Sequence, residues 1–227
     1  MDNTEIAKKM EILPDRDLTE TQLFVTTQTF DRYASKYAKE WEWNKKTIEE
    51  IKKYNIEPFS KHLEENETVL IVGSRSGRDF KLLSDQGFRC IGIEPSYGLI
   101  TEALERVPNG LFVNQDLRVL PFLPGSFDAI YSDNLSIIPK RDVRDILKDY
   151  RIFLKPSGIL YLSLKLGQSD VFVMNDLGGP RYMTMYEKET ILEFVRGTGF
   201  SILWSEESTH TDLSLPRWFS LVAKKSD

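Results

Sequence analysis

The chain begins with a helical pattern of apolar residues. Apolar and aromatic side chains recur there at spacings of three and four residues, namely Phe30, Tyr33, Ala34, Tyr37, Ala38 and Trp41. This spacing places them on one face of a helix that must pack against another element. The charged segment 45–66 predicts a second helix, broken near Pro58 because proline has no backbone N–H to continue the helical hydrogen bonds.

From residue 68 onward, short apolar runs alternate with amphipathic stretches. The runs predict strands at residues 69–72, 90–93, 111–113, 127–131 and 159–166. The amphipathic stretches predict helices at residues 80–86, 97–107, 143–150 and 187–196. This alternation predicts a Rossmann-like, doubly wound α/β fold with a mostly parallel sheet. Residues 167–184 read as an irregular connection, and the runs 200–204 and 219–223 predict a final antiparallel hairpin.

Composition narrows the class of protein. The 227 residues include 41% hydrophobic and 29% charged side chains with a net charge of −5, which is typical of a folded domain and not of a disordered chain. Cys90 is the single cysteine, and His62 and His210 are the two histidines, so a disulfide framework and a Cys/His zinc site are excluded. The first fifteen residues lack the apolar stretch of a signal peptide, and no later run approaches the ~20 apolar residues of a membrane span. We therefore expect a cytoplasmic protein without a membrane partner.

Candidate binding groups follow the first three predicted strands. In open α/β sheets, ligands bind outside the carboxyl ends of the strands. Residues 73–77 form a glycine-containing turn after the first strand, where Gly73 and Gly77 let the backbone approach a ligand. Glu94 follows the second strand and lies about twenty residues after Gly73. An acidic side chain at this place can accept hydrogen bonds from ribose hydroxyls. Asp116 and Leu117 follow the third strand and can present a carboxylate and a backbone N–H to an adenine edge.

The order of these groups resembles the class I S-adenosylmethionine-dependent methyltransferases, particularly the small stand-alone, type-11-like group with a helical N-terminal lid. The resemblance covers roughly residues 30–225. Five motifs carry it in register: VLIVGSRSGRD at 69–79, IGIEPS at 91–96, Asp116 with LPF at 120–122, SFDAI at 126–130, and LKPSGIL at 154–160. The resemblance implies an N-terminal helical lid over residues 1–66 and a methyltransferase domain over residues 67–227, together one compact unit.

The resemblance also implies roles for individual residues. Gly73, Ser74, Arg75 and Gly77 would wrap the methionine part of S-adenosylmethionine, while Glu94, with Pro95 beside it, would bind the ribose. Asp116 and Leu117 would bind the adenine, and Ser132, Asp133 and Asn134 would lie near the sulfonium. Tyr33 and Tyr37 of the lid would contact substrate and cofactor, since an aromatic face attracts a sulfonium.

Two positions depart from the family pattern. Family members usually carry an acidic residue in place of Ile71 and glycine in place of Arg75. A non-glycine residue in a left-handed conformation costs on the order of 1 kcal/mol, and a long cation can crowd the cofactor's amino end. Alternatively, Arg75 meets the cofactor's carboxylate or an acidic substrate. Both readings stay open, and with them the alternative of a non-catalytic, methyltransferase-like binding subunit.

Competing enzyme classes lack their central residues. A nicotinamide dehydrogenase would need Gly-x-Gly-x-x-Gly, and Tyr161 and Lys165 lie on a predicted strand that separates them by about 13 Å. The phosphate loop of kinases and the nucleophile elbow of hydrolases are missing from the sequence. The fifth strand ends without a carboxylate, so we expect no metal site. His210 is a weak candidate for a general base.

The predicted reaction is in-line transfer of a methyl group to a nucleophile. Acceptor contacts are expected from residues 33–43, from residues 132–136 with Asn134, and from residues 175–186. The last segment carries the cationic and aromatic side chains of a substrate wall, Arg181, Tyr182 and Tyr186. A small-molecule acceptor is expected first, because no appended domain grips a macromolecule. A tRNA or protein acceptor remains an alternative, with Arg217, Lys224 and Lys225 as a modest basic edge.

Overall fold

A run of helices precedes the first strand. The computed structural model describes residues 15–168, 170–174, 178–208 and 217–226. The helical run consists of α2 (Asp15–Tyr37), the π-helical turn η1 (Ala38–Glu42), α3 (Lys45–Ile51), the π-helical turn η2 (Lys52–Ile56) and α4 (Glu57–Ser60). Within the described part of the chain, no helix combines the length and the apolar character that crossing a membrane requires.

The predicted break near Pro58 takes a different form. Helical backbone continues from Lys45 to Ser60, and Pro58 lies in the first turn of α4, directly after the π-helical turn η2. Proline is tolerated at the start of a helix because its fixed φ suits the helical backbone. The helical run therefore ends at Ser60, not at residue 66. The proposed division between lid and domain at residue 66 stays a prediction.

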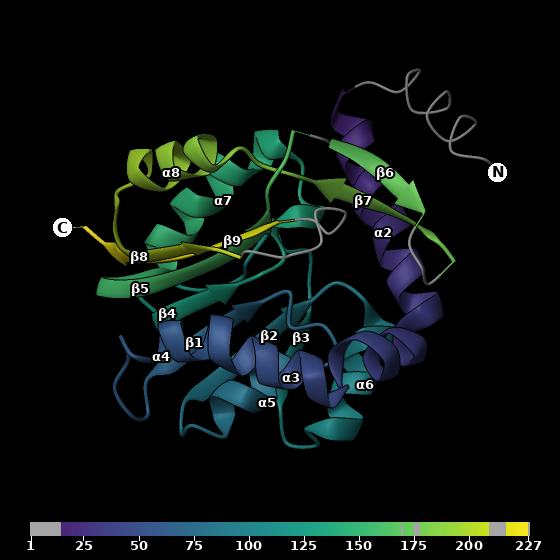
Figure 1. The fold of residues 1–227 in the computed structure, drawn as a ribbon, viewed down its shortest axis with the longest axis horizontal. Helices are drawn as coiled ribbons and strands as arrows, with labels where there is room; N and C mark the ends of the chain where they lie inside the picture. Colours follow the sequence, from purple (N-terminus) through teal and green to yellow (C-terminus); the bar gives the residue numbers. More distant parts are fainter. Residues whose placement is uncertain (1–14, 169, 175–177, 209–216, 227) are drawn as a thin grey trace.

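The strands form one large sheet and one small sheet (Figure 1). The large sheet consists of β1 (Thr68–Val72), β2 (Arg89–Glu94), β3 (Leu111–Asn114), β4 (Phe127–Ser132), β5 (Leu154–Lys165), β8 (Phe200–Glu207) and β9 (Trp218–Lys225). Its order is β3-β2-β1-β4-β5-β9-β8, with the first five strands parallel and β9 antiparallel to both neighbours. The predicted α/β fold and final antiparallel pair are confirmed. The carboxyl ends of β1, β4 and β5 meet at one edge, which is where ligands bind in such sheets.

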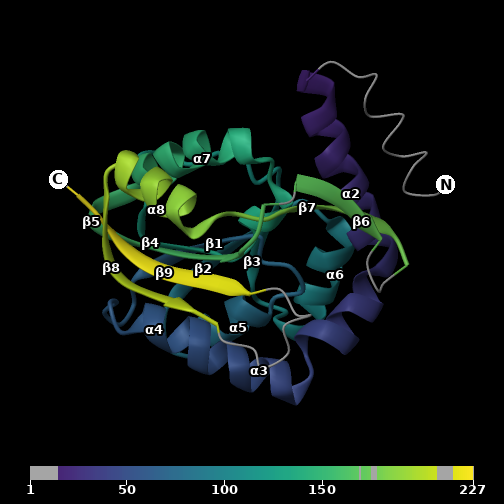
Figure 2. The same ribbon diagram turned by 45° about the horizontal axis from the view of Figure 1, so that its top comes forward.

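Helices cover both faces of the large sheet (Figure 2). They include α5 (Arg78–Ser84), α6 (Tyr97–Arg106), the short 3-10 helix η3 (Leu135–Ile137), α7 (Lys140–Phe153) and α8 (Lys188–Gly197). Alternate residues of β1 point to opposite faces of the sheet. Leu70 and Val72 pack in the core with α7 and α8, whereas Val69 and Ile71 pack with α4 and α5. Because both faces are buried, the strand reads as a continuous apolar run.

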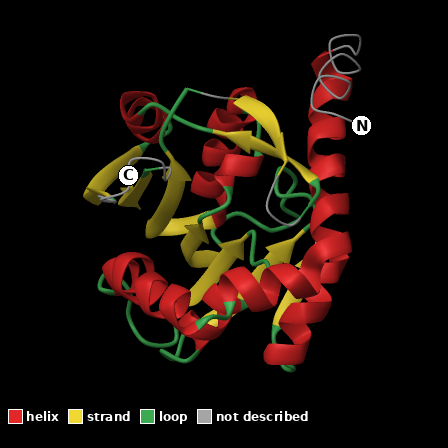
Figure 3. Ribbon diagram, turned by 45° about the vertical axis from the view of Figure 1, so that its right-hand side comes forward, coloured by secondary structure: helices red, strands yellow, loops and turns green. Residues whose placement is uncertain are grey.

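The segment expected to be irregular contains a second sheet. Residues 170–174 and 180–184 pair antiparallel as β6 (Asp170–Met174) and β7 (Pro180–Thr184). Strand β7 is held by α2, since Tyr182 N donates to Thr26 Oγ1 at 2.9 Å and Thr29 Oγ1 donates to Pro180 O at 2.5 Å. Figure 3 shows α2 standing beside this pair. The pairing was missed because it depends on a helix about 150 residues away in sequence, which local patterning does not report.

Helix α2 also docks on α6 through a polar clamp. The Asp31 carboxylate accepts hydrogen bonds from Ser96 Oγ at 2.7 Å and from Gly98 N at 2.9 Å, and Ser96 Oγ caps α6 by accepting from Leu99 N. An anionic side chain at a helix N-terminus is favourable. Beside the clamp, Phe30 and other α2 residues pack on Leu99. The N-terminal helix is thereby fixed beside the carboxyl end of β2.

Replacing Gly98 with alanine is expected to weaken this docking. A Cβ at residue 98 would lie 2.8 Å from the Asp31 carbonyl oxygen, so α2 must shift. Overpacking of this kind costs about 1–3 kcal/mol in the free energy of unfolding, measured by urea denaturation. Gly197→Ala is the matched control, because its Cβ would meet nothing closer than 3.8 Å. Equal stability of the two variants would contradict the close packing of α2 on α6.

Candidate functional site

The turn after β1 folds tightly over the sheet edge. Gly73 N and Ser74 N both donate to the carbonyl of Ile93, at 2.8 and 2.9 Å, which ties the turn to β2. Gly73 has a φ of 79°, and a Cβ there would lie 2.5 Å from the Asn134 side chain. Glycine is thus required both by conformation and by the close approach of the loop after β4.

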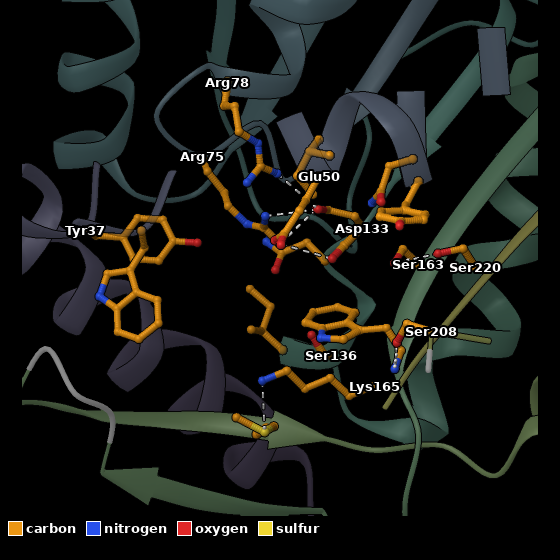
Figure 4. Close-up of a pocket in the computed structure, with 18 of the residues that line it drawn as sticks. Tyr37, Glu50, Arg75, Arg78, Asp133, Ser136, Ser163, Lys165, Ser208 and Ser220 are labelled. Atoms are coloured by element: carbon orange, nitrogen blue, oxygen red, sulfur yellow. Dashed lines mark hydrogen bonds and ion pairs between the residues drawn. The ribbon is translucent and has the colours of Figure 1, made fainter. Parts of the chain in front are cut away.

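Arg75 lies at the crest of this turn and points into the site (Figure 4). Its φ of 49° is left-handed, which costs a non-glycine residue about 1 kcal/mol. Its guanidinium contacts Asp133 at the carboxyl end of β4, with Nη2 2.8 Å from Oδ1 and Nη1 3.0 Å from Oδ2. The arginine side chain is 12% exposed and the aspartate side chain 6%. This pair is a buried, charge-assisted clamp between two strand ends.

A carboxylate from the N-terminal helices completes the cluster. Glu42 Oε1 lies 3.7 Å from the guanidinium nitrogens of both Arg75 and Arg78, and Glu42 Oε2 accepts from Ser76 N at 3.0 Å. Arg78 is paired with Asp79, with Nε 2.7 Å from Oδ1. The cluster therefore contains two arginines, Arg75 and Arg78, and three carboxylates, those of Glu42, Asp79 and Asp133. Their side chains are largely buried. It joins the helical segment to the turn after β1.

Burial governs the protonation of the acids in this region. It raises the pKa of Asp133 to about 6, against the opposing effect of the Arg75 charge. It also raises the pKa of Glu94, at the end of β2, to about 7, although Ser96 N and Arg75 N donate to the carboxylate at 2.9 and 3.0 Å. Each Glu94 oxygen accepts one bond and keeps acceptor capacity for a second donor. Glu94 is therefore suited to receive hydroxyl groups.

A cavity of about 750 Å³ opens in front of the carboxyl ends of β4, β5 and β8 and the amino end of β9. Helices α2 and α3 form one wall, and β7, β8 and β9 form another. Both arginines of the cluster, Asp133 and Asn134 line its inner end. Aromatic side chains line much of the rest, namely Phe30, Tyr37, Trp41, Tyr54, Tyr182, Trp204 and Trp218. A space of this size accommodates a small organic molecule next to the turn after β1.

Known proteins share this sequence pattern and architecture. Residues 69–158 match the model of a family described as a methyltransferase domain. An 18S rRNA (guanine-N(7))-methyltransferase from Bos taurus is 38% identical over 65 residues, which are 28% of this chain and 23% of that protein. The match thus spans about a quarter of the curated relative. Among solved structures, a SAM-dependent methyltransferase from Methanosarcina mazei has a TM-score of 0.67 at 18% identity, over 76% of this chain and 98% of that one.

The 1,6-didemethyltoxoflavin-N1-methyltransferase of Burkholderia thailandensis, solved with 1,6-didemethyltoxoflavin and S-adenosylhomocysteine, also has a TM-score of 0.67. Its identity is 18%, over 90% of this chain and 89% of that one. Residues 69–158 thus match a methyltransferase domain, and the chain shares the fold of S-adenosylmethionine-dependent methyltransferases. The predicted methyltransferase domain is confirmed over residues 69–158. The S-adenosylhomocysteine bound to the Burkholderia protein agrees with the predicted enzyme class and methyl donor. One of these proteins is named for a ribosomal RNA and another for a small heterocycle, so the likeness leaves the acceptor open.

The fold brings together six of the residues predicted for the site. They line the cavity and are Tyr37, Arg75, Asp133, Asn134, Arg181 and Tyr182. Glu94 is not among the residues that line the cavity, and it is joined to the turn 73–77 by the hydrogen bond from Arg75 N. Pro95 follows directly, where its carbonyl accepts from Asn114 Nδ2 at 2.8 Å.

Other predicted residues have different surroundings in the domain. Asp116 pairs with Arg118, whose Nη2 lies 2.6 Å from Oδ2, while Leu117 is buried in the core. Tyr186 is fully buried, with its hydroxyl donating to the carbonyls of Leu135 and Ile138. The Ser132 hydroxyl accepts from Tyr150, and Tyr33 lies against the Gly178–Gly179 turn. His210 and residues 175–177 lie outside the described residues.

Sequence reasoning missed Glu42 and Lys165. Glu42 is one of several charged residues in its segment, and the sequence carries no signal that singles it out for burial. Lys165 was considered only as part of a Tyr-x-x-x-Lys pattern, which its strand excludes. Its place at the end of β5 was the available signal, because strand ends line the ligand site in this fold.

Proposed function

We propose that this methyltransferase domain transfers a methyl group from S-adenosylmethionine to a small-molecule acceptor bound in the cavity between the N-terminal helices and β7 to β9. The observation that supports it is the position of this cavity: it reaches Arg75 and Asn134, which adjoin the turn after β1, and extends from there along the ends of β4 and β5. Donor and acceptor would thus meet at one strand edge. A cytoplasmic location is part of the proposal.

The residues at the strand edge fit the proposed cofactor. Glu94 has spare acceptor capacity for the ribose hydroxyls, and Gly73 and Gly77 keep the turn free of side chains. Arg75 is placed to hold the cofactor's carboxylate, which would share the guanidinium with Asp133. S-adenosylmethionine, when bound, supplies an activated methyl group. The chain contributes alignment of the acceptor and exclusion of water, with Tyr37 and Asn134 lining the inner end of the cavity.

The contacts of the basic side chains at this edge favour a small acceptor over a nucleic acid. Arg217 is paired with Glu207, with 2.6 Å between Nη1 and Oε1. Lys225 Nζ donates to the Leu154 carbonyl at 2.6 Å. The ion pair offsets the charge of Arg217, so this edge attracts phosphate groups less strongly than three unpaired cations would.

Calorimetric titration with S-adenosylhomocysteine tests the proposal, and its pH dependence is specific. We expect saturable one-to-one binding that is constant above pH 7.5. Below about pH 7 the affinity should fall by up to tenfold per pH unit, because the pKa of Glu94 is about 7 and only the ionised carboxylate accepts from both ribose hydroxyls. A Glu94→Gln variant should bind more weakly and lose this dependence.

The alternative is a non-catalytic binding subunit, favoured by the Arg75–Asp133 pair that fills the methionine end of the site. Absence of S-adenosylhomocysteine binding to the wild type at pH 8 would support this alternative and refute the proposed methyl transfer. Binding with a flat profile between pH 6 and 8 would instead refute the role given to Glu94.

A further inference from the structure

Lys165 is a half-buried cation in the cavity, and no carboxylate of the described residues forms an ion pair with it. It is the last residue of β5, and Figure 4 shows its side chain reaching into the cavity. Its Nζ lies 3.7 Å from Met183 Sδ and 5.3 Å from the centre of the Trp218 ring. No acidic side chain in the described ranges comes within 4.0 Å of that nitrogen. A thioether and an aromatic ring are weak partners for an ammonium group.

The surroundings of Lys165 are electrostatically unfavourable for its charge. Burial, followed by the charges of Arg181 and Arg75, lowers the pKa of Lys165 to about 8. Glu50 of α3 and Glu206 of β8 also line the cavity, without forming an ion pair with Lys165. An anionic group placed beside Lys165 would relieve both the burial of its charge and its repulsion from Arg181.

Flat apolar surfaces adjoin this cation. Trp218 pairs with Lys165 across the β5–β9 ladder and presents its ring to the ammonium group. Tyr182 of β7 and Trp204 of β8 line the same cavity. Aromatic walls favour planar ligands, which stack on them in offset or edge-to-face arrangements. The cavity therefore combines aromatic surfaces with an unsatisfied positive charge.

We propose that the methyl acceptor is a planar aromatic compound with an acidic group, and that Lys165 binds this group and selects anionic acceptors. The inference rests on the proposed function and adds the chemical class of the acceptor. Arg181 stands on the facing strand β7 and supports the same selection through its charge. Lys165 acts here as a specificity-determining residue at the cavity wall.

A pair of fluorescent dyes tests the acceptor class without knowledge of the natural substrate. 1-Anilinonaphthalene-8-sulfonate carries a planar naphthalene ring and a sulfonate anion, and N-phenyl-1-naphthylamine is its neutral counterpart. We expect Lys165→Met to raise the Kd of the sulfonate dye about tenfold and that of the neutral dye less than twofold. Lys165→Arg should retain sulfonate binding. Lys155→Met is the matched control, because Lys155 lies on the same strand, at the end away from the cavity, and pairs with Asp128.

The pH profile gives a second readout. Between pH 7 and 9 the wild type should lose affinity for the sulfonate dye, while Lys165→Met should show a flat profile. Equal sulfonate affinity of the wild type and Lys165→Met, or a parallel loss of both dyes, would overturn the proposal. Titration of the same samples with S-adenosylhomocysteine separates the two failures. If the wild type binds S-adenosylhomocysteine but dye affinity does not depend on Lys165, only the proposed acceptor class is wrong. If the wild type does not bind S-adenosylhomocysteine, the proposed function itself fails.

Discussion

Replacing Arg75 with glycine is expected to lower the free energy of unfolding by about 2–4 kcal/mol at pH 7.5. The substitution leaves the Asp133 carboxylate buried, with Arg78 at 3.6 Å as its remaining cation in the described cluster. Losing one partner of a buried ion pair costs about 3–5 kcal/mol, and release of the left-handed strain at residue 75 returns about 1 kcal/mol. Urea denaturation followed by tryptophan fluorescence measures the change.

The loss should shrink as the pH falls. In the native protein the pKa of Asp133 is about 6, and removal of Arg75 raises it further above the ordinary value of 3.8. The folded variant then binds more protons than its unfolded chain between those pKa values, so its stability decreases as the pH rises through that window. At pH 5 the neutral carboxyl needs no ionic partner, and the difference from the wild type should be smaller than at pH 7.5.

Two further variants identify the cause. The double variant Arg75→Gly/Asp133→Asn should recover at least about 1 kcal/mol, because it removes the unpaired charge. Arg118→Ala breaks the half-exposed pair with Asp116 and should cost less than about 1 kcal/mol. If Arg75→Gly were as stable as the wild type at pH 7.5, the buried pair would not exist in solution.

The fold was predictable wherever its stabilising contacts are local or follow from two-sided burial. The run 69–72 matched β1 (Thr68–Val72) to within one residue, because a strand covered on both faces needs apolar side chains at every position. Strands β6 and β7 were missed because they depend on α2, distant in sequence. The insertion of β9 between β5 and β8 was equally invisible, since alternation of elements says nothing of their spatial order.

The sequence predicted those site residues that directly follow a strand. Glu94 and the turn 73–77 follow predicted strands, and the sheet brings them together through the bond from Arg75 N to Glu94. Arg75 was recognised as a departure, but its partner could not be chosen, because Asp133 lies 58 residues further on. Glu42 and Lys165 became evident only once the N-terminal helices and β7 were placed around the cavity.

Replacing Glu94 with alanine is expected to weaken S-adenosylhomocysteine binding by about 100-fold at pH 8, measured by calorimetry. Glu94 is 2% exposed, so bulk water does not replace its carboxylate as the acceptor of a ribose hydroxyl. The substitution also leaves the N–H groups of Arg75 and Ser96 without their acceptor, which loosens the turn that faces the cofactor. Glu94→Gln keeps one oxygen in place and should lose less affinity than Glu94→Ala.

Asp116→Ala is the comparison that tests this ranking. The Asp116 side chain is 34% exposed, and its carboxylate already accepts hydrogen bonds from Arg118. It therefore has less acceptor capacity left for a ligand than Glu94 has. We expect a loss of affinity of less than about tenfold, since a solvent-exposed hydrogen bond contributes about 0.5–1.5 kcal/mol. If Asp116→Ala weakened binding more than Glu94→Ala, the cofactor would depend on the end of β3 and not on the end of β2. Folded Glu94→Ala protein with unchanged affinity would exclude Glu94 from the ribose site altogether.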